Sequence, residues 1–125
     1  MRKSREKFIR ETFFDILKSS SSGLYTISTE EVISILMEQP APRFFVSFHT
    51  ARRMVSLMIR GIQPKGINKN KLMMYKEILD RYIQEGGDGK QYKALERIIE
   101  QPAPSLYVNR STMRSIVYRS LKNKF

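Results

Sequence analysis

The chain has 125 residues, 41% of them hydrophobic, which excludes the composition of a disordered protein despite a net charge of +11. It contains no cysteine, which excludes disulfides, thiolate metal sites and cysteine nucleophiles and fits folding in a reducing compartment. No apolar run approaches the roughly 20 residues of a membrane span, and the basic N-terminus lacks the apolar core of a secretory signal. We therefore expect a single cytoplasmic domain over residues 1–125, with no membrane partner.

The first expected elements are two helices separated by a loop. Apolar residues at spacings of three and four mark one face of the first helix: Phe13, Ile16 and Leu17. The serine-rich segment at 19–23 predicts an exposed loop. Ser28 is placed to cap a second helix, and Glu31, three residues later, would complete a capping box. This second helix should run to about Met37.

A proline corner and an extended rib should follow the second helix. The sequence EQPAP at 38–42 ends the helix, because Pro40 cannot continue it and keeps its predecessor out of helical geometry. The aromatic and β-branched run RFFV at 43–46 favours an extended rib. Ser47 occupies the N-cap position of a third helix of about a dozen residues.

The second half of the chain repeats this order. A shift of 62 residues places EQPAP at 38–42 on EQPAP at 100–104, and apolar segments on both sides match without a gap. The second copy has a helix bearing Leu72 to Tyr82, a glycine-rich loop at 85–89, a rib SLYV at 105–108 and a cap at Asn109. We expect a mainly α fold built from an internally duplicated unit, helix–loop–helix–PAP corner–short extended rib–helix, over about 8–61 and 70–123. The two ribs could also pair as one short two-stranded ladder.

The basic residues are distributed unevenly along the chain. Residues 39–76 contain eight lysines or arginines and no acid, and residues 101–125 contain five and no acid. The third helices and the N-terminus therefore carry the basic character. The candidate contacts are Arg52, Arg53 and Arg60 on one third helix, Arg110, Arg114, Arg119 and Lys122 on the other, and Arg2, Lys3 and Arg5 at the N-terminus.

This charge pattern favours binding to a polyanion. Two basic helices and a basic N-terminus could neutralise phosphates along a duplex or a single strand, through the backbone rather than base edges. An acidic protein surface would satisfy the same electrostatics, so a structural or adaptor protein within a larger assembly is the alternative function. A charged helix face can also be merely solvated. The aromatics of the two ribs could stack exposed bases, although core packing suits their place beside a proline corner better.

Residue types that carry catalysis are scarce. His49 is the only histidine, and Ser111 stands at its place in the second copy, which excludes histidine-rich metal sites and duplicated nucleophile–histidine–acid arrangements. Glu38 and Glu100 recur beside the corners, where structural roles suit them better than Mg²⁺ binding or acid–base catalysis. The GGDG segment lacks the lysine and strand of a phosphate-cradling loop. We expect a non-enzymatic protein without a cofactor or metal.

One segment of the first copy resembles proteins of mobile elements. The sequence PAPRFFVS at 40–47, followed by a helix with Ala51, Arg52 and Arg53, is similar to segments in small uncharacterised proteins of Bacteroidales phages, including crAss-like phages, and of conjugative elements. The second copy departs from it at Ser105 and Asn109. The resemblance implies a mobile-element setting, in the host cytoplasm or in a virion, and assigns no functional residue.

Overall fold

A computed structural model describes residues 2–20 and 27–124 and shows a mainly helical protein in those ranges, as the sequence predicts. The helices are α1 (Arg2–Ser20), α2 (Thr29–Met37), α3 (Phe48–Ile59), α4 (Lys69–Gln84), α5 (Ala94–Ile98) and α6 (Arg110–Lys124). Of the loop predicted at 19–23, Ser19 and Ser20 belong to α1, and the rest lies outside the described residues. The loop predicted at 85–89 follows α4 directly.

The predicted helix starts are confirmed by their side-chain caps. Ser28 Oγ accepts a hydrogen bond from the backbone N–H of Glu31 at 3.1 Å. In the same way, Ser47 Oγ accepts from Thr50 N at 3.2 Å, and Asn109 Oδ1 accepts from Thr112 N at 2.8 Å. Each cap satisfies one of the N–H groups that the first turn of a helix leaves without an intrahelical acceptor. Asn68 caps α4 in the same way, accepting from Lys71 N at 2.8 Å. Helix α5 is short and begins without a side-chain cap.

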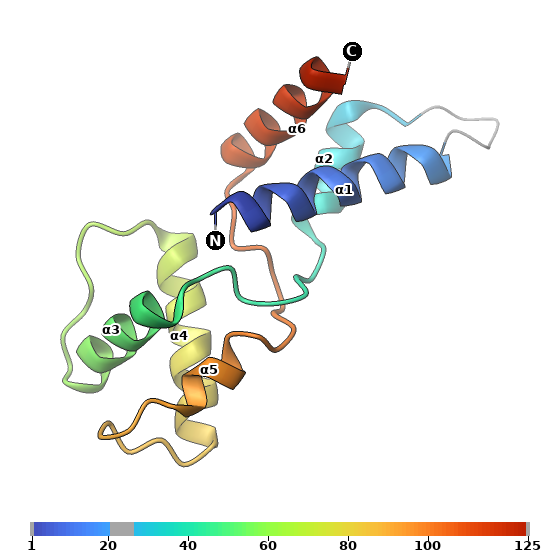
Figure 1. Cartoon of the computed structure of the whole chain (residues 1–125). Coiled ribbons are helices and arrows are strands. Elements are labelled where there is room, and N and C mark those ends of the chain that lie inside the picture. Colours follow the sequence, from blue (N-terminus) through green and yellow to red (C-terminus); the bar gives the residue numbers. More distant parts are fainter. Residues whose placement is uncertain (1, 21–26, 125) are drawn as a thin grey trace. The chain divides into compact units, whose positions relative to one another are not determined.

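The helices form two compact units, which do not coincide with the two predicted repeat units. Unit 1 comprises Met1–Pro40 with Pro104–Phe125, and its helices α1, α2 and α6 pack against one another (Figure 1). Unit 2 comprises Ala41–Ala103, and α3, α4 and α5 pack together in it. The chain therefore passes between the units inside each PAP corner. The single domain predicted over residues 1–125 stays a prediction.

Each unit has its own apolar core, formed by one face of each of its helices. The core of unit 1 contains Ile9, Phe13, Val32, Ile33, Leu36, Met113, Ile116 and Val117. The core of unit 2 contains Phe44, Ala51, Val55, Ile78, Tyr82, Leu95 and Ile98. Burial of such side chains contributes roughly 1.5–3 kcal/mol each, which makes these faces the main stabilising contribution of their units.

The expected two-stranded ladder is not confirmed. Among the described residues, strand-like pairing is limited to one antiparallel bridge, in which Ala41 N donates to Ala103 O and Ala103 N donates to Ala41 O, both at 2.9 Å. The next ladder positions would need the N–H groups of Gln39 and Gln101. Those groups donate instead to Leu36 O and Ile98 O at the ends of α2 and α5. The pairing stops after one residue pair because the helix ends use the donors.

The two corners have closely matching environments. Burial agrees residue for residue between 38–47 and 100–109: the prolines are exposed, both alanines are buried, and the first and third apolar rib positions are buried in each copy. The ribs differ in backbone geometry at Tyr107, which has a φ of 53°. The corners therefore fold alike where their sequences match, while the duplication itself stays a prediction.

The loop after α4 is organised around Tyr82, which is fully buried. Its hydroxyl donates to Gln91 O at 2.7 Å and accepts from Gly89 N at 3.0 Å, and its ring stacks on Tyr92 with centroids 5.5 Å apart. Gly87 lies directly against the ring, because a Cβ added there would come within 2.4 Å of it. A glycine at this position lets the loop close over the aromatic ring.

Substituting Gly87→Ala should therefore destabilise unit 2 by about 1–3 kcal/mol, because the new methyl group overlaps the buried ring of Tyr82. Thermal unfolding followed by circular dichroism measures the effect. Gly61→Ala is the comparison variant, because its φ of +79° is strained for alanine while no atom lies within 4 Å of the added Cβ. A larger loss in Gly61→Ala than in Gly87→Ala would contradict the steric explanation.

Candidate nucleic-acid interface

Three of the predicted contacts lie on the exposed face of α3 and its C-cap residue, Arg60, in unit 2, which we call the α3 face. Arg52, Arg53 and Arg60 are exposed, and their spacing places them on one side of the helix, opposite the buried Ala51 and Val55. Within residues 2–20 and 27–124, no carboxylate forms an ion pair with any of these three guanidinium groups. The α3 face thus keeps its positive charge.

Aromatic side chains lie near two arginines of this α3 face. The guanidinium carbon of Arg52 lies 5.6 Å from the centre of the Tyr92 ring, and Tyr92 in turn stacks on Tyr82. Such a cation–π contact orients an arginine without neutralising its charge. Arg53 lies near the buried Tyr75: burial raises the pKa of the Tyr75 hydroxyl, and the positive charge of Arg53 opposes this rise. Arg52 is therefore positioned by an aromatic side chain, and Arg53 lies close enough to Tyr75 for its charge to act on the hydroxyl.

In unit 1, two arginines of α6 share one carboxylate. Arg114 Nε contacts Glu30 Oε1 at 3.1 Å, and Arg110 Nη2 contacts Glu30 Oε2 at 3.3 Å and Ser34 Oγ at 3.1 Å. The Tyr118 hydroxyl lies 3.4 Å from Glu30 Oε1. The hydrogen bond from Arg114, helped by the charges of Arg114 and Arg110, holds the pKa of the Glu30 carboxyl below its ordinary value, although desolvation opposes this. We call Glu30 with these four partners the Glu30 cluster.

The remaining predicted contacts also lie in unit 1. Arg119 of α6 pairs with Glu6 of α1 at 3.2 Å, whereas Lys122 is exposed. On α1, Lys3 is exposed and Arg5 is partly buried, while the side chain of Arg2 lies outside the described residues. The carboxylates of Glu30 and Glu6 thus partly offset the positive charge that the three arginines of α6 present to an external anion.

The structure divides the predicted contacts between the two units. Arg52, Arg53 and Arg60 lie together on unit 2, and the others belong to unit 1. Sequence reasoning missed the partners Tyr92, Glu30 and Tyr118. The shift of 62 residues carried a usable signal, because it places Arg52 on Arg114 and Glu30 on Tyr92. Those four residues form two arginine contacts, Arg114 with Glu30 and Arg52 with Tyr92.

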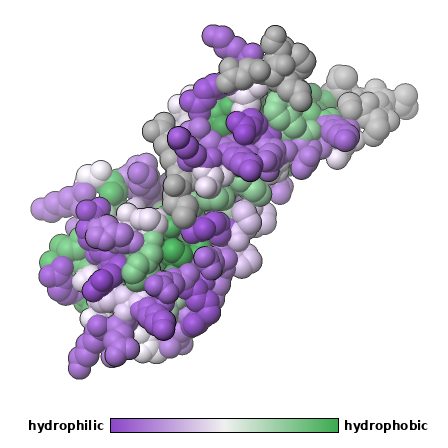
Figure 2. Space-filling view, viewed as in Figure 1, coloured by the Kyte–Doolittle hydropathy of each residue, from purple (hydrophilic) through white to green (hydrophobic). Residues whose placement is uncertain are grey.

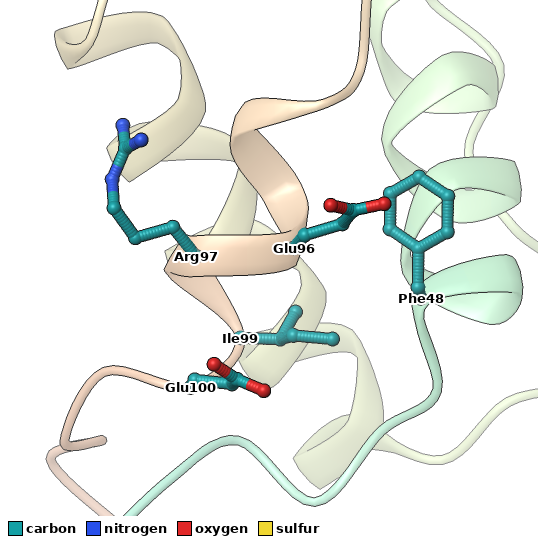
Figure 3. A pocket seen from close by; sticks show the side chains of 5 residues that line it. All are labelled: Phe48, Glu96, Arg97, Ile99 and Glu100. Atoms are coloured by element: carbon teal, nitrogen blue, oxygen red, sulfur yellow. The ribbon is translucent and has the colours of Figure 1, made fainter.

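The rib residues differ in burial, and some acidic residues line a pocket. Phe44 and Leu106 are buried in the cores, as expected for a packing role, whereas Phe45 and Tyr107 are only partly buried. Arg81 lies 4.8 Å over the Phe44 ring. A shallow pocket in unit 2 is lined by Phe48, Glu96, Arg97, Ile99 and Glu100. Figure 3 shows Glu96 beside the Phe48 ring and Arg97 pointing away from it. Over the described ranges, no three metal-ligating side chains gather into a possible ion site.

The face of the molecule seen in Figure 2 carries both hydrophilic and apolar side chains. Figure 2 shows hydrophilic side chains over most of the visible face of both units. No helix in the described part of the chain has the length and apolar character that crossing a membrane requires. No protein-family model, curated protein or solved structure matches the chain.

The Glu30 cluster makes a prediction about pH. Because the two guanidinium groups lower the pKa of Glu30 in the folded state, the ion pairs stabilise the fold at neutral pH, and this contribution is lost as the pH falls below about 4.5 and through the folded-state pKa. A carboxyl-carbon NMR titration should show Glu30 titrating below that value and moving up towards it in Arg114→Ala. Arg119→Ala, which removes the partner of Glu6, should leave the titration of Glu30 unchanged. An unshifted Glu30 in the unmodified protein would refute the cluster.

Proposed function

We propose that this protein is a non-enzymatic basic protein that binds nucleic acid through the phosphate backbone, and that it comes from a phage or another mobile element. The observation that carries the proposal is the α3 face, where Arg52, Arg53 and Arg60 have no ion-paired carboxylate among the described residues. Exposed guanidinium groups of this kind bind phosphate through charge-assisted hydrogen bonds. The nearby lysine-rich segment, which begins at Lys65 and runs through the first turns of α4, adds to the positive charge of unit 2.

The arrangement favours backbone contact over base reading. Each of the three arginines can donate to a phosphate, whereas base readout needs side chains of defined geometry inserted into a groove. Arg52 is held by Tyr92, so less side-chain entropy is lost when it binds. The Glu30 cluster of unit 1 contributes less, because its guanidinium groups are already engaged with a carboxylate.

A structural or adaptor function is the second candidate, and a separate observation favours it. Ile59 and Ile62 at the end of α3 are 38% and 47% exposed, close in sequence to Arg60. Apolar side chains at the edge of a basic face suit an acidic protein partner, as in a virion or another assembly, better than a solvated phosphate backbone. The Glu30 cluster also shows that arginines of this chain bind carboxylates readily.

We propose in addition that the chain arose by internal duplication, with repeat units of about 8–61 and 70–123. Matching burial at 38–47 and 100–109 and the equivalent caps at Ser47 and Asn109 support this. The same order of helix, helix, corner and helix occurs in both halves. The duplication explains why EQPAP occurs twice: each copy needs the same corner.

Fluorescence anisotropy with labelled duplex and single-stranded DNA over a range of salt concentrations tests the nucleic-acid function. Binding should weaken steeply as salt rises, and for duplex DNA the log–log slope should flatten by about 0.9 for each phosphate contact removed. Replacing Arg52, Arg53 and Arg60 by alanine together should weaken binding on both nucleic acids and flatten the slope. No binding at low salt, or an affinity that does not change with salt concentration, contradicts the proposal.

A charge-matched control separates the α3 face from net charge. Arg53→Ala and Arg97→Ala each remove one exposed positive charge from unit 2, but Arg97 already pairs with Glu85 at 2.7 Å. Arg53→Ala should reduce affinity more than Arg97→Ala, with helix content unchanged in both. Equal losses would show that only net charge matters. An assembly whose size does not change on nuclease treatment, together with no DNA binding, would favour the adaptor function.

A further inference from the structure

The third helix in each compact unit comes from the other repeat. Helices α1 and α2 of the first repeat pack with α6 of the second, and α4 and α5 of the second repeat pack with α3 of the first. Units built without exchange would instead have paired α2 with α3 and α5 with α6. Figure 1 shows α6 beside α2 and α3 beside α4. The composition of the units therefore points to exchange of an element between the repeats.

The side-chain contacts of the third helices agree with this exchange. In unit 1, Arg114 of α6 contacts Glu30 at the start of α2. The residue 62 positions after Glu30 is Tyr92, and the residue 62 positions before Arg114 is Arg52. Those two residues are in contact in unit 2, with the guanidinium carbon 5.6 Å from the ring centre. Equivalent positions are therefore in contact in both units, each time between residues of different repeats, although Glu30 lies in α2 and Tyr92 lies just before α5.

A second pair of positions behaves in the same way. In unit 1, Arg110 at the first position of α6 contacts Ser34 Oγ at 3.1 Å. The equivalent positions in unit 2 are Phe48 at the start of α3 and Glu96 of α5. Both line one pocket, and Figure 3 shows the Glu96 side chain beside the Phe48 ring. The residue types differ between the copies, while the two equivalent positions are neighbours in both units.

The bridge between the corners completes the correspondence. Ala41 and Ala103 are equivalent under the same shift, and they exchange both backbone hydrogen bonds at 2.9 Å. A bridge between equivalent residues maps onto itself when the repeats are interchanged, as contacts on the axis of a two-fold dimer do.

We propose that the first two helices of each repeat form a docking surface for a third helix supplied by another repeat, and that the two repeats of this chain exchange these helices. The partner that the surface fits is a second copy of the repeat, which this chain carries covalently. The inference rests on the proposed duplication and is independent of nucleic-acid binding. It implies that a chain with one repeat would complete its fold only as a homodimer, by reciprocal exchange.

Paramagnetic labelling of the full chain tests which third helix each docking surface holds. Because the sequence has no cysteine, Ser34→Cys and Glu96→Cys each give a single labelling site at equivalent positions of α2 and α5. A nitroxide at position 34 should broaden the amide NMR signals at the start of α6 most strongly, and one at position 96 those at the start of α3. Stronger broadening of α3 from position 34 and of α6 from position 96, or broadening of neither helix start, would overturn the exchange. The two variants serve as each other's controls.

Cleavage of the folded protein provides a second test. A protease site inserted between the exposed Lys65 and Gly66 would cut the chain between α3 and α4, leaving one product with α1, α2 and α3 and another with α4, α5 and α6. Since each unit contains helices of both products, they should elute together at the size of the intact protein and separate only in denaturant. Native separation of two folded products overturns the proposal. Loss of DNA binding by the cut but undivided protein would count against the proposed function alone.

Discussion

The reciprocal hydrogen bonds between Ala41 and Ala103 hold together the two segments on which the rest of this structure depends. Both alanines are buried, and each lies between two exposed prolines. A proline has no N–H to donate. Here two prolines stand on either side of each bridged alanine, at positions that donate no hydrogen bond to the bridge. The corners can therefore be stiff and still pair through a single residue each. The stiffness limits the directions in which the rib and third helix can leave the corner.

The two units differ in the residue that meets an arginine at positions 62 residues apart. In unit 1, Arg114 contacts the carboxylate of Glu30. In unit 2, Arg52 at the equivalent position contacts the aromatic ring of Tyr92. A carboxylate offsets the charge of an arginine, whereas a ring orients the arginine and leaves its charge intact. One structural position therefore yields a partly neutralised surface and a fully charged one. This difference is the reason that the proposed binding face centres on α3.

Local features of the fold could be predicted from the sequence, whereas the composition of the units could not. The caps at Ser28, Ser47 and Asn109 and the helix ends before the prolines depend on hydrogen bonds within a few residues, so the local sequence determines them. Both third helices show an apolar stripe, and nothing in the pattern tells which pair of helices each stripe covers. The expected ladder is not confirmed for a related reason. The backbone N–H groups of Gln39 and Gln101 donate to carbonyl groups at the ends of α2 and α5, and the periodicity of a sequence does not show this competition for donors. The candidate arginines were chosen by charge, whereas the residues that contact them, Glu30 and Tyr92, are distant from them in the sequence and were missed.

Unit 1 contains segments from both ends of the chain, so the order of synthesis limits the order in which the two units can fold. Multidomain chains usually fold from the N-terminus as each domain leaves the ribosome. Here the central segment Ala41–Ala103 contains every helix of its unit, while α1 and α2 must wait for α6, which is translated after all of them. Until then, the buried face that includes Phe13, Ile33 and Leu36 stays uncovered in the nascent chain. The earliest-made helices of this protein are thus the last to acquire their finished core.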